Sequence, residues 1–249
     1  PEDLNNLLVL GLSANVMMIG LGVMSPLPAG SADGVRGELG IDQHDLVIAC
    51  FGFILSHKGI DTLIETIRPL ERATGRNVRM IGLHSILDAR SEQTLNAYRA
   101  RAEELQVEHN INWITDYLPI QECLRILSAA DYVIFPYKET QESASAAVTI
   151  GLATLKPVLV SPIHIFSDLS EATWRMSGSQ ADDIVASIAE LEDSPAKAGE
   201  LVARQEQWIQ DRSWGRISGR LDATVQALLF ARRHLDPLVG VQREANPSV

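Results

Sequence analysis

A glutamate followed by a run of small residues is the stretch of this sequence best suited to chemistry. The run comprises Glu142, Ser143, Ala144, Ser145, Ala146 and Ala147. We expect a helix of about a dozen residues to begin near Glu142. The backbone N–H groups of a first helical turn lack partners within the helix, and the helix dipole adds positive charge there. Small side chains would leave these groups open to an anion such as a phosphate, and Glu142 could accept hydrogen bonds from a sugar hydroxyl. Helix physics alone favours an alternative, in which Glu142 only complements the dipole and the small residues allow close packing.

Two further segments carry residues that could meet the same ligand. In the first, residues 51–61, Gly52 lets the backbone turn close to a ligand and Lys58 could neutralise a diphosphate. In the second, residues 115–120, Tyr117 and Leu118 could line a pocket for a base. The alternatives are a solvated surface lysine and a plain loop. The histidines at positions 57 and 84 have no second ligand at metal spacing, so we predict no metal site.

Strands and helices must alternate for these loops to meet. Five apolar, β-prone runs predict strands at residues 46–53, 78–83, 111–115, 131–135 and 157–161. Helical patterns cover residues 59–73, 89–107, 120–130, 181–192, 196–210 and 214–233, and a short helix could lie within residues 1–12. Residues 163–176 give no clear pattern. This alternation predicts an α/β fold, a Rossmann-like doubly wound parallel sheet in which ligands bind at the carboxyl ends of the strands.

Composition limits the classes of function. The chain has 249 residues, a hydrophobic content of 46% and a formal net charge of −11, which argues against nucleic acid as a partner. Cys50 and Cys123 each lie in an apolar run, so we expect buried free thiols. No apolar run reaches membrane-spanning length. The chain starts at Pro1 and shows no signal peptide, from which we expect an excised domain.

The order and spacing of these motifs resemble a known family. From residue 15 to residue 229 the chain is similar to the carboxyl-terminal, donor-binding domain of the family-4 (group 1) retaining glycosyltransferases of the GT-B fold. The matching stretches are FGFILSHKGIDTLIETI, ADYVIFP, ESASAAVTIGLATLKPVLVS and ANVMMIGLGVM. The sequences TQESASAAV and FGF…HKG most closely resemble those of mannosyltransferase-like members that build bacterial surface polysaccharides.

The resemblance implies roles for individual residues. Lys58 would bind the donor diphosphate, Glu142 would contact the donor sugar, and residues 143–146 would offer backbone amides to the phosphates. The chain departs from the family at three positions: Phe53 replaces an arginine, Ile150 a second glutamate that holds the ribose, and Leu155 a glycine. One phosphate cation and one ribose contact are therefore missing or come from elsewhere.

The resemblance also implies partners and organisation. Residues 1–40 would be the end of a preceding domain and a linker, residues 41–235 a nucleotide-sugar-binding domain, and residues 236–249 a flexible tail. The full-length enzyme would transfer a hexose, such as mannose from GDP-mannose, to a polysaccharide or lipid-linked acceptor without a metal or other cofactor. It would work in the cytoplasm, or at the inner face of the membrane through contacts of an amino-terminal Rossmann-like domain, and this part alone would be inactive.

Two alternatives remain from the sequence. One is a degenerate, non-catalytic domain that acts as a binding module or scaffold, which the residues at positions 53 and 150 favour and Lys58 and Glu142 oppose. The other is a nucleotide-sugar epimerase of similar fold, for which we find no clear acid–base pair.

Overall fold

The computed structural model describes residues 7–11, 17, 19–140, 142 and 144–240, without the side chains of residues 233–240. Its centre is a six-stranded sheet in the order β3-β2-β1-β4-β5-β6, with every neighbouring pair parallel. The chain winds outward in both directions from β1 and β4, which confirms the predicted doubly wound α/β fold. The strands are β1 (Leu46–Phe53), β2 (Val78–Ser85), β3 (Ile111–Ile114), β4 (Tyr132–Phe135), β5 (Val158–Val160) and β6 (Trp174–Arg175).

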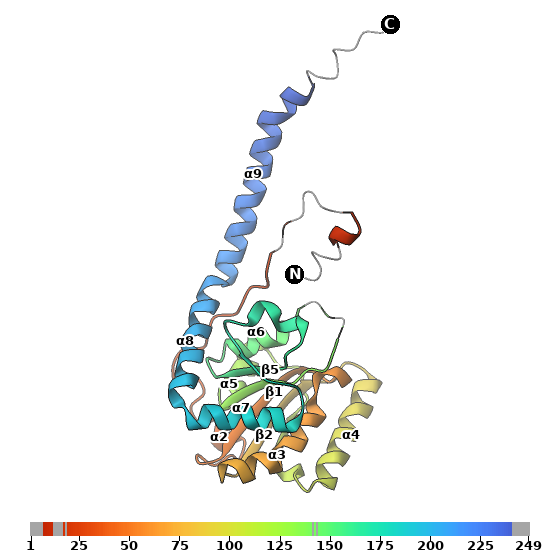
Figure 1. The fold of residues 1–249 in the computed structure, drawn as a ribbon, viewed down its shortest axis with the longest axis vertical. Coiled ribbons are helices and arrows are strands. Elements are labelled where there is room, and N and C mark those ends of the chain that lie inside the picture. The colour runs from red at the N-terminus through yellow and green to blue at the C-terminus, as the bar shows by residue number, and fades with distance from the viewer. Residues whose placement is uncertain (1–6, 12–16, 18, 141, 143, 241–249) are drawn as a thin grey trace.

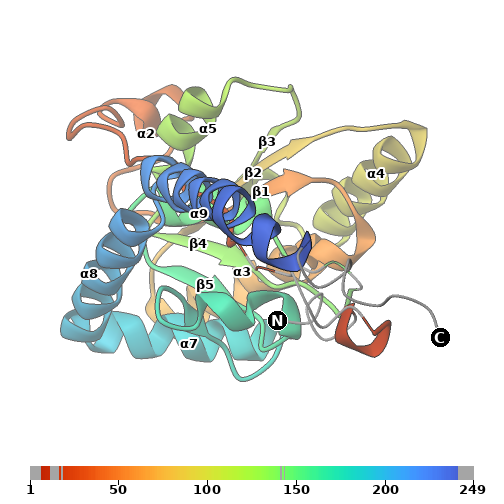
Figure 2. The same ribbon diagram turned by 90° about the horizontal axis from the view of Figure 1, so that it is seen from above.

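Helices cover both faces of the sheet because its strands are apolar on both sides (Figure 2). In β1, Val47 and Ala49 join the hydrophobic core on one face, while Ile48 and Cys50 join the core on the other. The first face packs against α2 (Val35–Glu38), α5 (Ile120–Leu127), α6 (Ala146–Leu152) and the end of α8 (Pro195–Asp211). The second packs against α3 (Ile60–Thr74), α4 (Ala89–Glu104) and α7 (Ala181–Asp193). Cys50 and Cys123 are buried free thiols, as predicted.

Several helix boundaries differ from the sequence prediction. α4 ends at Glu104 because Gln106 has a left-handed φ of 56°, which a continuing helix does not allow. α5 ends at Leu127, before the predicted residue 130. The helix predicted to begin near Glu142 begins only at Ala146, and the preceding Ser145 is extended at φ −117° and ψ 106°. Ala144 and Ser145 therefore belong to a connecting segment rather than to a helical turn.

The amino-terminal segment meets the chain again at the junction of α8 and α9 (Trp214–Gly240). α9 rises away from the sheet, and the segment before residue 25 lies beside its base (Figure 1). There the Val23 N–H donates to the Arg212 carbonyl at 2.9 Å. α9 reaches into the expected tail of residues 236–249, of which 241–249 lie outside the described residues. In the part of the chain that is described, no helix is both long and apolar enough to cross a membrane.

Part of the expected linker within residues 1–40 is packed onto the domain. It contains α2, in which Val35 is fully buried. Arg36 donates to Asp131 at 2.7 Å and to the Ala129 carbonyl at 2.9 Å. These contacts tie the segment to the amino-terminal edge of β4.

Candidate functional site

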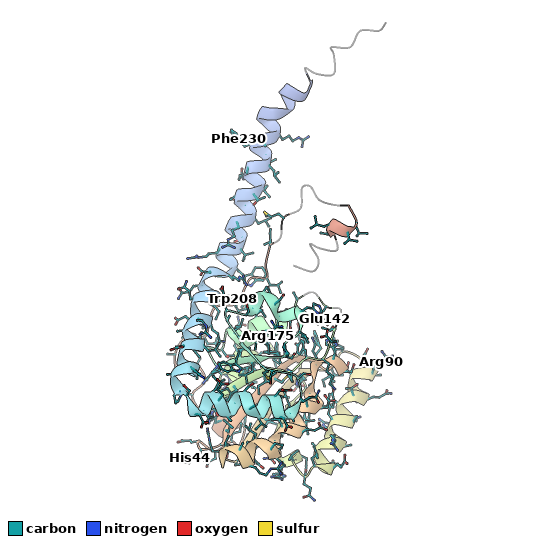
Figure 3. The ribbon with its side chains drawn as sticks, viewed as in Figure 1. His44, Arg90, Glu142, Arg175, Trp208 and Phe230 are labelled. Carbon is teal, nitrogen blue, oxygen red and sulfur yellow. The ribbon has the colours of Figure 1, made fainter. Side chains whose placement is uncertain are left out.

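A cavity of about 570 Å³ opens at the carboxyl edge of the sheet, where the strand order reverses between β1 and β4. In Figure 3 Glu142 marks this edge of the domain and His44, which precedes β1, marks the opposite one. The cavity brings together residues from the loops after β1, β3 and β4. It is lined by Gly52, Phe53, Lys58, Tyr117, Leu118, Glu142, Ala144, Ser145 and Ala146. Ser143, the remaining residue of the predicted site, lies outside the described residues.

Lys58 is a buried cation rather than a solvated surface lysine. Its side chain is 9% exposed, and its Nζ lies 3.1 Å from the Glu142 Oε2 and 4.1 Å from the centre of the Tyr137 ring. Lys58 ends a short 3-10 helix, η1 (Ser56–Lys58), and Gly59 follows with a φ of 69°. Any side chain at Gly59 would also collide with the carbonyl oxygen of Pro136. The sequence HKG thus positions the lysine through a turn that only glycine fits.

Glu142 belongs to an ion pair and not to a helix terminus. One carboxylate oxygen contacts Lys58, and the other lies 3.3 Å from the His57 Nε2. The side chain remains 40% exposed toward the cavity. Because α6 begins at Ala146, Glu142 cannot complement the dipole from the first turn, so both the predicted helix start and the dipole alternative are wrong.

The helix that follows is a weaker electrostatic element than the sequence indicated. α6 has seven residues, so its dipole is short. Ser145 precedes the helix but makes no capping hydrogen bond, since its hydroxyl lies 3.2 Å from the Tyr137 hydroxyl. The backbone N–H groups of Ala146 and Ala147, both cavity residues, belong to the first turn and lack helical acceptors. Lys58 is therefore the main positive group of the cavity.

Tyr137 is a supporting residue that the sequence analysis missed. Its side chain is fully buried, and its ring contacts His57 and Phe135 edge-on, each at 5.9 Å between ring centres. Burial raises the pKa of its phenol. Its carbonyl accepts a hydrogen bond from Ser161 at 2.6 Å. The only signal in the sequence is an aromatic residue two positions after a buried strand.

The backbone at Gly52 takes a conformation that side chains rarely adopt, with φ at 135°. The Gly52 carbonyl lies 3.3 Å from the Nδ1 of His84, whose ring is fully buried. Phe53 and Tyr117, which are 39% and 84% exposed, lie on the rim of the cavity. The position of Tyr117 in the loop after β3 was predicted from the strand end, whereas Gly52 lies within β1 and its contact with His84 was not predicted.

Other lining residues come from distant parts of the chain. Trp214, at the start of α9, is 55% exposed and its ring covers Gly22, where a Cβ atom would collide with it. Leu21 and Thr149 also line the cavity. Ile150 lines it as well, so the position of the family's second glutamate presents an apolar group. Nothing local in the sequence indicates that the segment at 21–24 and α9 meet here.

The structure shows no preformed metal centre within its described residues, in which no group of three or more His, Cys, Asp or Glu side chains is placed to hold an ion. Burial lowers the pKa of His84 to about 4. Burial, and next the charge of Lys58, lower the pKa of His57 as well. Both imidazoles are therefore neutral at neutral pH, and the charges facing the cavity centre are those of Lys58 and Glu142.

The comparisons with known proteins agree with this architecture. Residues 33–209 match the family model described as "Glycosyl transferases group 1". No curated protein matches the chain. Sucrose-phosphate synthase from Thermosynechococcus elongatus superposes with a TM-score of 0.71 at 16% identity, over 91% of this chain and 56% of that one. HepE from Anabaena, in complex with UDP and glucose, superposes with a TM-score of 0.69 at 14% identity, over 81% of this chain and 53% of that one.

A third solved structure has nearly the extent of this chain. The carboxyl-terminal domain of the glycosyl transferase group 1 protein LpcC from Francisella tularensis gives a TM-score of 0.62 at 13% identity, over 78% of this chain and 98% of that one. At these identities the likeness concerns the fold. This chain spans little more than half the length of the first structures.

Proposed function

The chain belongs to the group 1 glycosyltransferases, and from this premise we propose that it binds the nucleotide-sugar donor of a retaining glycosyltransferase. The observation that carries the proposal is the cavity itself. Two loops that are far apart in the sequence bring a buried lysine, a carboxylate and a helix start to one site at the switch point of the sheet, and a third contributes Tyr117 and Leu118. Open α/β sheets bind nucleotides at this place. A volume of about 570 Å³ suits a small organic ligand.

The charges of the cavity suit a leaving diphosphate. When the bond between the sugar and the phosphate breaks, negative charge develops on the phosphate oxygens. Lys58 and the first backbone N–H groups of α6 would stabilise that charge electrostatically, without a metal. Glu142 would accept hydrogen bonds from the hydroxyls of the donor sugar and fix its orientation. The sugar would pass to a hydroxyl of the acceptor with retention at the anomeric carbon.

The finer identity of the ligands rests on the resemblance. We propose a hexose donor, with GDP-mannose as the first to test, and a polysaccharide or lipid-linked acceptor on the cytoplasmic side of the membrane. UDP is the alternative nucleotide, because HepE is described in complex with UDP and glucose. The acceptor side of the site would come from an amino-terminal Rossmann-like domain of the same protein. This chain alone would then bind donor and catalyse little.

Titration of the full-length protein with nucleotides tests the proposal. We expect calorimetry to show binding of GDP or UDP, and binding of GDP-mannose or UDP-glucose with the same base preference. Lys58→Ala should weaken binding, whereas Lys138→Ala should not, because Lys138 pairs with Asp61 outside the cavity lining at 2.6 Å. Absence of binding to all four ligands would contradict the proposal and support a scaffold role. The anomeric configuration of the product, read by NMR, tests retention.

A further inference from the structure

His57 is the third member of the charged cluster, and the proposed chemistry gives it no role. Its Nε2 is buried and makes no hydrogen bond within the described part of the chain. The group nearest to accept one is the Glu142 Oε1 at 3.3 Å. Hydrogen bonds at a ligand-free site are often long and shorten when the ligand binds. Since a carboxylate only accepts, the imidazole tautomer that satisfies this contact carries its proton on Nε2.

The His57 ring is held from sides other than Glu142. Its edge packs against the buried Tyr137 ring, and its backbone carbonyl accepts the Lys138 N–H at 2.8 Å. The turn at Gly59 also fixes the 3-10 helix that carries it. Glu142, in contrast, lies in a connecting segment outside any helix or strand. The imidazole of His57, the hydrogen-bond donor, is therefore held more firmly than the carboxylate of Glu142, the hydrogen-bond acceptor.

The two oxygens of Glu142 have different partners. Lys58 contacts Oε2 and His57 faces Oε1. If a donor phosphate takes Lys58 as its counter-ion, Glu142 loses its charged partner while it must still face the sugar. An N–H group on the other oxygen keeps the carboxylate in place during that exchange.

We propose that His57 is a positioning residue for Glu142: its Nε2–H holds one carboxylate oxygen so that the other faces the donor sugar once Lys58 binds the diphosphate. This inference rests on the proposed function. It predicts that His57 affects recognition of the sugar and not of the nucleoside diphosphate. A residue that merely supported the loop of Lys58 would affect both.

The experiment compares two ligands on the full-length protein. Affinities for a nucleoside diphosphate and for its sugar derivative, either GDP with GDP-mannose or UDP with UDP-glucose, are measured by calorimetry, and their ratio is taken for each variant. His57→Phe keeps a ring against Tyr137 but has no N–H. It should lower the relative affinity for the sugar nucleotide about tenfold and leave the diphosphate affinity within about twofold, as expected for one lost charge-assisted hydrogen bond. His57→Gln places an amide N–H near the same position and should restore the ratio.

The possible results separate this inference from the proposed function. If His57→Phe weakens the affinities for both ligands equally, or leaves the ratio of the two affinities unchanged, the role of His57 is overturned while donor binding stands. Failure of the wild type to bind either ligand overturns the proposed function, and the role of His57 falls with it. If His57→Phe does not fold, as judged by its melting temperature, His57→Leu takes its place. A relative affinity for the sugar nucleotide that stays low in His57→Gln would also count against the inference.

Discussion

Acidification should destabilise the fold through His84, a residue behind the cavity. The imidazole is 1% exposed, and its Nδ1 lies 3.3 Å from the Gly52 carbonyl, which can only accept. The proton of the neutral ring therefore sits on Nδ1. The Nε2 is buried without a partner within the described residues. A second proton there would bring a positive charge into the core, without an acceptor and near Lys58.

The size of the effect follows from the pKa of His84 in the fold. Burial lowers it from 6.5 to about 4, against the opposing effect of the Gly52 hydrogen bond. Well above pH 6.5 the ring is neutral in both the folded and unfolded states and contributes no pH dependence. As the pH falls toward about 4, the unfolded state gains a proton that the folded state does not. At about 1.36 kcal/mol for each pKa unit, the fold loses about 3 kcal/mol, most of it by about pH 4.5.

Urea denaturation at pH 7 and pH 4.5 measures this loss. His84→Asn keeps an N–H for the Gly52 carbonyl but cannot titrate, so between these two pH values its stability should fall by about 2 kcal/mol less than that of the wild type. The comparison cancels the carboxylates, which both proteins share. His109→Asn, which replaces an exposed histidine, is the control and should follow the wild type. Equal pH dependence in wild type and His84→Asn would refute the reasoning.

Three further predictions concern the cavity of the full-length protein. Lys58→Ala should cost about 1.5–3 kcal/mol in donor binding or transition-state stabilisation, because a charge-assisted contact to the diphosphate is lost; unchanged binding and kinetics would contradict it. Glu142→Gln should lower turnover at least about tenfold. Its melting temperature should stay near normal, because the amide side chain of this variant keeps an oxygen for Lys58 and the side chain at position 142 is 40% exposed. Normal turnover with a large drop in melting temperature would return Glu142 to a structural role. Transfer should persist in EDTA, and activity that is lost on chelation and restored by magnesium or manganese would reveal a metal site.

The sequence predicted the parts of the fold that depend on local pattern. The apolar run at 46–53 became β1 with the same ends. β6 consists of two residues, too few for a period to appear, and it was missed. Leu155 occupies the position of the family's glycine with a left-handed φ of 55°, so the chain keeps the backbone turn without the residue that usually signals it.

The prediction of the site was limited by contacts that no local pattern encodes. The rule that parallel strands present their loops at one edge indicated that Lys58, Tyr117 and Glu142 could meet one ligand, and the family resemblance then favoured a shared site over a surface lysine and a plain loop; all three line the cavity. The predicted start of α6 was wrong because Glu142 pairs with Lys58, which lies 84 positions away in the chain. The roles of Tyr137 and Trp214 likewise arise from packing between distant segments.

The contact between Lys58 and Glu142 affects which anions can bind to the lysine. A carboxylate attached to the same chain is present at Lys58 at a high effective concentration, which a freely diffusing ion must exceed to displace it. Chloride or inorganic phosphate would gain only the one contact and lose the competition. A ligand that also fills the apolar cavity gains further free energy from its other groups. We therefore expect the ion pair to disfavour binding of abundant small anions at Lys58 relative to binding of a larger ligand.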